Sequence, residues 1–210
     1  MPIKVALVSP SGVIDQSQLD LALAKATSLG LKIVYETKNK SCEIGFLNGS
    51  KNERLLELSN AEQLSADAIW CVRGGFGAIE LWNEYQKDLY QNHQAVLVGY
   101  SDITLYHFMR FYRGGRIGIH GPIFLDLLKG PNFLEALELL INKKAERLIY
   151  PALKSLNHFL ANKITGELIV MNLASLQSII GCFETNFFQN KYSSYMFTKR
   201  FQTHSCTYLP

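Results

Sequence analysis

The chain has 210 residues, of which 48% are hydrophobic and 19% charged, and its formal net charge at pH 7 is +3. This balance excludes a disordered chain, and the length allows one large core or two modest ones. The charge is too small, and the Lys and Arg residues too dispersed, to indicate a nucleic-acid partner. No apolar run reaches the roughly 18 residues of a membrane span, so we expect no membrane association, and the first residues do not resemble a signal peptide.

The four cysteines are widely scattered, at positions 42, 71, 182 and 206, and none forms a C-x-x-C pair. This spacing predicts reduced thiols in a cytoplasmic protein rather than a disulfide framework or a zinc site. No cysteine has a sequence context that indicates a nucleophile.

The first elements predict a parallel sheet. Ile3–Val8 is an apolar strand followed by the turn-forming loop Ser9–Gly12, and Asp15–Leu29 has the period of an amphipathic helix with Gly30 as its C-cap. Leu31–Tyr35 is the next strand, so the unit is β–α–β with a right-handed crossover. The loop lacks the glycine spacing of a phosphate-binding motif, which disfavours a nucleotide-binding domain.

A polar loop over 36–50 leads to a second helix, Lys51–Leu64. We expect its leucines to face the core and its polar residues to face solvent. The expected inward set is Leu55, Leu56 and Leu58, and the expected outward set is Asn52, Glu53, Arg54 and Glu57.

The third unit has a glycine-rich loop at the end of a strand. Ala68–Val72 is almost wholly apolar, as in the centre of a covered sheet, and it leads into Arg73–Gly77. A helix is expected next, through Ile79, Leu81 and Trp82. The loop is either a plain strand-to-helix turn or the source of a backbone N–H donor for an oxyanion.

The fourth unit places a serine between a strand and a helix. Ala95–Gly99 is a short buried strand, a helix starts at Asp102, and Ser101 lies on the sharp turn between them. Such a serine either caps the helix or is the exposed nucleophile of a hydrolase. Both this turn and Arg73–Gly77 follow parallel strands at their C-terminal ends, the edge that carries the binding crevice in open α/β sheets.

His120 ends the next predicted strand, and it is either a general base or a structural hydrogen-bond donor. The remaining expected elements are a strand over 117–120, a helix over 133–142, a polar connection over 154–163, a strand over 164–171 and a helix over 172–180 that Gly181 ends.

The sequence predicts an N-terminal α/β domain over 1–150, a linker over 151–165 and an incomplete C-terminal domain over 166–210. After Gly181 the chain contains no further Gly, Ala, Val or Ile and a single Leu. No apolar period persists there, so we expect no regular secondary structure and interpret 192–210 as an aberrant tail.

Taken together, the motifs resemble the LD-carboxypeptidase family of serine peptidases, which includes muramoyltetrapeptide carboxypeptidases and the self-immunity peptidases that inactivate microcin C. The similarity covers roughly residues 3–181, and Arg-Gly-Gly-aromatic-Gly followed by Gly-Tyr-Ser-Asp-Ile-Thr is its most specific part. The matching segments, in the family's order, are Ser9–Gly12, Gly45–Arg54, Arg73–Gly77, Gly99–Thr104 and His120–Pro122.

The resemblance implies a two-domain cytoplasmic hydrolase without metal or cofactor, active in peptidoglycan recycling. It would release the terminal D-alanine from a muropeptide tetrapeptide, a small peptide substrate, and a homodimer is left open. Carried over by position, Ser101 is the nucleophile, and the backbone N–H groups of Gly75 and Asp102 form the oxyanion hole.

The chain also departs from the family. Val170–Leu173 reads Val-Met-Asn-Leu where the family usually has Gly-Gly-Asn-Leu, and the family's catalytic glutamate and histidine are not found. Glu184 and His204 lie outside the expected motifs and are not assigned. We therefore expect a truncated or frameshifted, inactive and self-associating form. The alternative is a non-catalytic module that binds a cell-wall peptide or another small ligand.

Overall fold

The structure is a computed structural model that describes residues 2–85, 95–112, 118–130, 134, 167–182 and 191–196. Its centre is a five-stranded sheet in which every pairing is parallel, in the order β2-β1-β3-β4-β5. The strands are β1 (Lys4–Val8), β2 (Lys32–Tyr35), β3 (Ala68–Cys71), β4 (Val96–Gly99) and β5 (Ile119–His120). The predicted α/β fold with a parallel sheet is confirmed.

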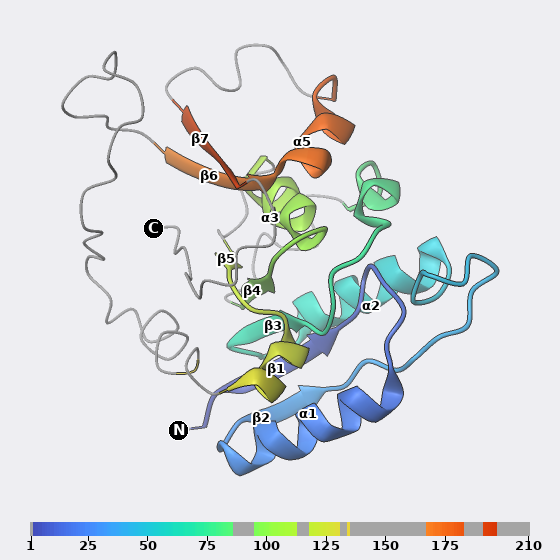
Figure 1. Ribbon diagram of the computed structural model, residues 1–210, viewed down its shortest axis with the longest axis vertical. Coiled ribbons are helices and arrows are strands. Elements are labelled where there is room, and N and C mark those ends of the chain that lie inside the picture. The colour runs from blue at the N-terminus through green and yellow to red at the C-terminus, as the bar shows by residue number, and fades with distance from the viewer. Residues whose placement is uncertain are drawn as a thin grey trace.

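Helices cover both faces of this sheet (Figure 1). One face packs against α1 (Gln16–Ser28) and the 3₁₀ helix η3 (Phe124–Lys129). The other packs against α2 (Lys51–Gln63), α3 (Ile103–Tyr112) and the 3₁₀ helix η1 (Ala78–Leu81). Because alternate residues of a strand point to opposite faces, Ala6 joins one core and Leu7 the other.

The orientation of α2 differs from the sequence prediction. Arg54 and Glu57 are buried, whereas Leu56 is 60% exposed. The inward face therefore consists of positions 54, 57, 58, 61 and 62, the i, i+3, i+4, i+7, i+8 set of one helix face. The placement of Arg54 and Glu57 outside was wrong because backbone groups of the strand-end loops supply these two side chains with hydrogen-bond partners.

The helix termini follow local signals in the sequence. Asp15 caps α1 by accepting from the Gln18 backbone N–H, and Ser50 and Glu53 form a reciprocal capping box on α2. The end of α1 differs slightly from the prediction, because Leu29 is its C-cap and Gly30 follows in the left-handed region at φ +79°. The helix expected around Ile79–Trp82 is the single 3₁₀ turn η1.

A second, two-stranded sheet lies beside α3 (Figure 1). It pairs β6 (Glu167–Asn172) in parallel with β7 (Lys191–Met196), and α5 (Leu173–Ile179) follows β6. The expectation of no regular element after Gly181 was therefore wrong for 191–196. That strand is specified by its pairing with β6 rather than by an apolar period of its own.

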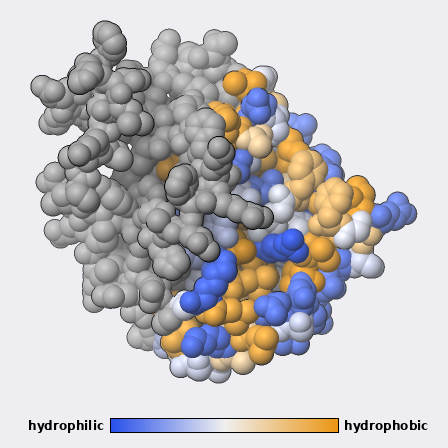
Figure 2. All heavy atoms as spheres, in the orientation of Figure 1, coloured by the Kyte–Doolittle hydropathy of each residue, from blue (hydrophilic) through white to orange (hydrophobic). Residues whose placement is uncertain are grey.

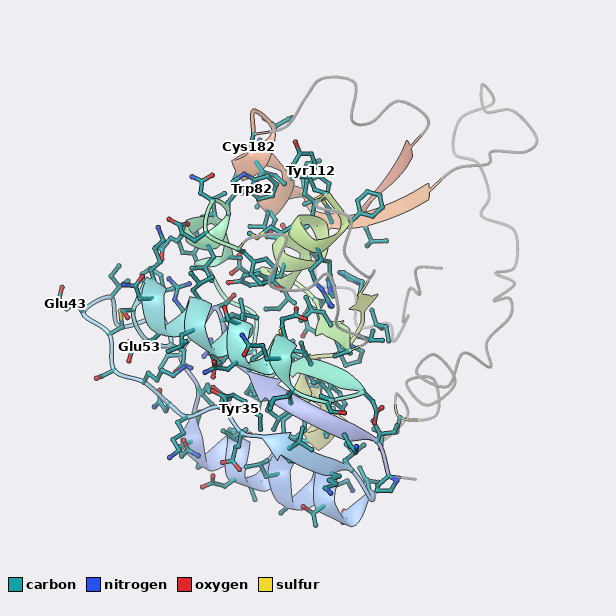
Figure 3. All side chains as sticks on the ribbon, turned by 180° about the vertical axis from the view of Figure 1, so that it is seen from behind. Tyr35, Glu43, Glu53, Trp82, Tyr112 and Cys182 are labelled. Carbon is teal, nitrogen blue, oxygen red and sulfur yellow. The ribbon has the colours of Figure 1, made fainter. Side chains whose placement is uncertain are left out.

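Residues of β6 and α5 share the core of the first sheet. Met171, Leu176 and Ile179 belong to the same buried cluster as α3, and the Asn172 backbone N–H donates to Thr104 Oγ1 at 3.3 Å. Figure 3 shows Trp82 and Tyr112 close together near this region, and their ring centroids lie 5.9 Å apart. The predicted helix 133–142 (Leu134 apart), the linker 151–165 and the rest of the tail lie outside the described residues, and the domain limits stay a prediction.

Within the described ranges, no helix has both the length and the apolar character needed to cross a bilayer. On the face drawn in Figure 2, hydrophobic residues reach the surface in several places and are interspersed with hydrophilic ones.

Candidate functional site

Three loops meet at one edge of the sheet. They are Ser9–Gly12 after β1, Arg73–Gly77 after β3 and Tyr100–Asp102 after β4, and these three strands are neighbours. From β1 the chain adds β2 on one side, and it then crosses to the other side of β1 to add β3, β4 and β5 in turn. The strand order therefore reverses between β1 and β3. Ligand crevices of open α/β sheets form at such switch points.

Glycines let the first two loops touch through their backbones. The Gly12 N–H donates to the Gly74 carbonyl at 3.1 Å, and a Cβ on Gly12 would lie 2.7 Å from that oxygen. A Cβ on Gly75 would lie 2.9 Å from the Gly12 Cα, and Gly75 itself has φ +130°, which side chains rarely allow. The double glycine is therefore a packing requirement between these loops.

Ser101 lies against the same glycines. A Cβ on Gly74 would lie 3.1 Å from Ser101 Cβ and 3.4 Å from its Oγ. Ser101 has φ +66°, and it is the one non-glycine residue of the described chain with a positive φ. This left-handed turn between strand and helix is the backbone geometry of a nucleophile elbow.

The Ser101 side chain does not cap α3 in the described structure. Its backbone carbonyl accepts from the Thr104 N–H at 3.0 Å and from Thr104 Oγ1 at 2.7 Å. No hydrogen bond of Ser101 Oγ occurs among the described residues. The hydroxyl of this half-buried residue is thus left available for chemistry, which weakens the helix-cap interpretation.

The Asp102 carboxylate is buried among the three loops rather than exposed to solvent. Its Oδ2 accepts from Ser11 Oγ at 2.6 Å and from the Ala78 backbone N–H at 3.0 Å. Burial raises the pKa of Asp102 above its usual value, and these two hydrogen bonds, with the nearby positive charge of Arg54, oppose that rise. One side chain therefore connects all three loops.

Two further buried side chains bind the same backbone. Arg54 Nη1 donates to the carbonyls of Pro10 at 3.1 Å and Gly77 at 3.0 Å, and its Nη2 pairs with Glu80. The Tyr106 hydroxyl donates to the Pro10 carbonyl at 2.9 Å. No site role was predicted for either side chain. The position of Arg54 at the end of a family-like segment is the signal that could have indicated its role.

The two described histidines of this region are His107 and His120, and the His107 side chain binds the backbone. His107 Nε2 lies 2.9 Å from the Gly99 carbonyl and must donate to it, while burial lowers the pKa of His107 to about 3. His120 pairs with Gly99 in the sheet register, and burial also lowers its pKa. No hydrogen bond between His120 and Ser101 occurs in the described structure, and Glu184 and His204 lie outside it.

Comparison with known proteins adds independent findings. A family model described as the LD-carboxypeptidase N-terminal domain matches residues 5–121. A probable murein peptide carboxypeptidase of Bacillus subtilis is 28% identical over 84% of this chain and 56% of its own length. The murein tetrapeptide carboxypeptidase of Pseudomonas aeruginosa is 29% identical over 61% of this chain and 42% of its own. The chain thus spans about half the length of these curated relatives.

Solved structures share the fold. The muramoyltetrapeptide carboxypeptidase of Oxalobacter formigenes superposes with a TM-score of 0.66 at 17% identity, covering 85% of this chain and 60% of that one. An MccF-like protein of Bacillus anthracis gives 0.64 at 20% identity, covering 85% and 62%. Since the family model covers more than half of the sequence, the chain belongs to the LD-carboxypeptidase family.

Proposed function

We propose that this chain carries the nucleophile and the oxyanion hole of a serine-type carboxypeptidase acting on murein peptides. The observation that carries the proposal is the close approach of Ser101, on its left-handed turn, to Gly74, where an added Cβ would lie 3.4 Å from Ser101 Oγ. Gly75, whose N–H is one proposed oxyanion donor, follows Gly74 directly in the chain. The curated relatives named for murein peptides supply the substrate class.

The proposed reaction is acyl transfer followed by hydrolysis. Ser101 Oγ attacks the carbonyl carbon before the terminal D-alanine, and the N–H groups of Gly75 and Asp102 stabilise the negative charge on the carbonyl oxygen. The C–N bond then breaks, D-alanine leaves with a proton on its nitrogen, and water hydrolyses the ester to restore the serine. The proton acceptor belongs to a glutamate–histidine pair in the family, and the described residues contain no side chain bonded to Ser101 that fills this role.

A serine-directed fluorophosphonate tests the nucleophile. An intact, activated site should take up one label per chain at Ser101, located by tandem mass spectrometry, and the Ser101→Ala variant should take up none. Ser50→Ala is the matched control, because Ser50 also precedes a helix but caps it, and it should label as the wild type does. Labelling of a different serine, or equal labelling of Ser101→Ala, would reject the assignment.

The second candidate is a module that binds the peptide without turnover, which the lack of a described acid–base partner for Ser101 Oγ favours. Calorimetric binding of a muropeptide tetrapeptide without labelling would support this alternative. The inactivity of the 210-residue chain stays a prediction, and D-alanine release from the tetrapeptide would contradict it. We further propose cytoplasmic peptidoglycan recycling as the setting, supported by the scattered cysteines, and leave a homodimer to sedimentation analysis.

A further inference from the structure

The Asp102 side chain makes contacts that the proposed chemistry does not use. It is 8% exposed, and Oδ2 accepts both from Ser11 Oγ at 2.6 Å and from the Ala78 N–H at 3.0 Å. An aspartate near the start of a helix ordinarily caps that helix. Here the first-turn N–H groups of Thr104 and Leu105 bind the backbone carbonyls of Ser101 and Asp102 instead. The carboxylate therefore acts between loops, not on its own helix.

The two proposed oxyanion donors lie on different loops, so their separation depends on what holds those loops together. The Gly75 N–H belongs to the loop after β3, and the Asp102 N–H to the turn after β4. Gly75 at φ +130° and Gly77 at φ +115° occupy conformations that only glycine adopts readily. Because glycine is flexible, a glycine-rich backbone keeps such a conformation only when hydrogen bonds from neighbouring segments hold it.

The Ala78 N–H makes such a hydrogen bond, because Ala78 directly follows Gly77 and its N–H donates to Asp102 Oδ2. Ser11 extends the connection to the loop after β1, where the neighbouring Gly12 N–H holds the Gly74 carbonyl at 3.1 Å. The stretch from Gly74 to Ala78, which contains the Gly75 donor, is thus fixed at both ends, by Gly12 at Gly74 and by Asp102 at Ala78.

We propose that the Asp102 side chain is a positioning residue that sets the distance between the Gly75 N–H and the Asp102 N–H by binding Ala78 and Ser11. This proposal rests on the proposed function. One residue would thereby supply an oxyanion donor from its backbone and place the other donor with its carboxylate. Preorganised donors matter because they stabilise charge without reorganising during the reaction.

The test combines amide hydrogen exchange with Ser101 labelling on the full chain. Asp102→Ala removes the acceptor, so exchange in 73–78 should become at least roughly tenfold faster, and the labelling rate should fall roughly ten- to hundredfold. Ser11→Ala should give a smaller change in the same direction. Asp102→Asn keeps an acceptor oxygen in the place of Oδ2 and should restore most of both values.

Tyr85→Phe is the matched control. It removes another buried hydrogen bond, from the Tyr85 hydroxyl to Glu62 at 2.7 Å, and keeps the ring that packs against Tyr106. It should leave exchange in 73–78 and labelling unchanged. If Asp102→Ala fails to fold, Ser11→Ala and Asp102→Asn carry the test.

The two proposals fail in different ways. Wild-type exchange in 73–78 for both Asp102→Ala and Ser11→Ala would overturn the positioning role, whatever the labelling shows. Faster exchange in these variants, in a chain whose Ser101 never reacts, would support the positioning of the loop while rejecting the proposed nucleophile. Faster exchange that Asp102→Asn does not reverse would also overturn the role of Oδ2 as an acceptor.

Discussion

At the scale of single residues, glycines decide how closely the loops of the site approach each other. A Cβ on Gly12 would lie 2.7 Å from the Gly74 carbonyl, which is backbone and cannot rotate away. We expect Gly12→Ala to push the two loops apart, to lower stability by about 1–3 kcal/mol and to slow Ser101 labelling. Thermal unfolding and the labelling rate measure the two effects.

Gly45→Ala is the control for this change, because a Cβ on Gly45 would meet nothing within 4 Å. Gly45 is also free of the positive φ that would strain an alanine. It should remain within about 0.5 kcal/mol of the wild type. Equal losses from Gly12→Ala and Gly45→Ala would contradict the packing argument.

His107 makes stability depend on pH. Burial lowers its pKa to about 3, against about 6.5 in the unfolded chain, so the unfolded state binds more protons between these values. Stability therefore falls as the pH drops below about 6.5, approaching about 1.4 kcal/mol per pH unit, until the pH reaches about 3.

Chemical denaturation of wild type and His107→Gln from pH 7 to pH 4 measures this contribution. Glutamine keeps an N–H donor for the Gly99 carbonyl but does not titrate. The variant should show a shallower loss of stability on acidification, since other titrating groups are common to both proteins. Parallel curves would show that His107 is not the buried neutral imidazole described above.

The residues of the site differ in how far the sequence could predict them. Ser101 and the Arg73–Gly77 glycines follow strands directly, so position alone placed them at the edge of the sheet. Arg54 was assigned to solvent because its partners are backbone carbonyls, which every residue has and no pattern identifies. The buried contacts of Asp102 were missed for the same reason, since they join residues up to 91 positions apart.

At the scale of elements, the start of α2 is fixed by a local motif. Ser50 accepts from the Glu53 N–H, and Glu53 accepts from the Ser50 N–H at 2.8 Å. We expect Ser50→Ala to cost about 1 kcal/mol in a thermal melt, because one helix-terminal N–H loses its partner.

Ser59→Ala is the matched change in the same helix. Its hydroxyl donates to the Leu55 carbonyl at 2.9 Å, a bond within the helix that gives little stability, and alanine is the better helix former. This variant should be neutral or slightly more stable than the wild type. A loss as large as that of Ser50→Ala would show that the cap contributes nothing particular.

Strands were predictable where burial on both faces left an apolar run, as in β3, and not where pairing alone specifies them. β7 reads Lys-Tyr-Ser-Ser-Tyr-Met, without an apolar alternation, yet it pairs with β6 along all six residues. Tyrosine favours strands, but this preference depends strongly on context and is a weak signal.

At the scale of the whole molecule, the β–α–β pattern predicted a parallel sheet but not its strand order. The order β2-β1-β3-β4-β5 places the first strand inside the sheet, and the loop after it becomes part of the site. This placement follows from long-range packing, in which α1 and η3 cover one face while α2 and α3 cover the other. No local sequence pattern predicts that β3 pairs with β1, on the side away from β2.

The strand order also predicts which strands exchange their amide hydrogens slowly and which exchange them faster. β1 and β3 are each paired on both sides, and their residues Val5–Val8 and Ala68–Cys71 are fully buried. Their amides should therefore exchange only when the whole domain unfolds. β2 is an edge strand, paired only with β1, and its residues are exposed or half-buried. Hydrogen exchange followed by mass spectrometry should therefore find β1 and β3 slowest and β2 faster. Exchange of β2 as slow as that of β1 would show either that β2 is not at the edge or that another chain covers it.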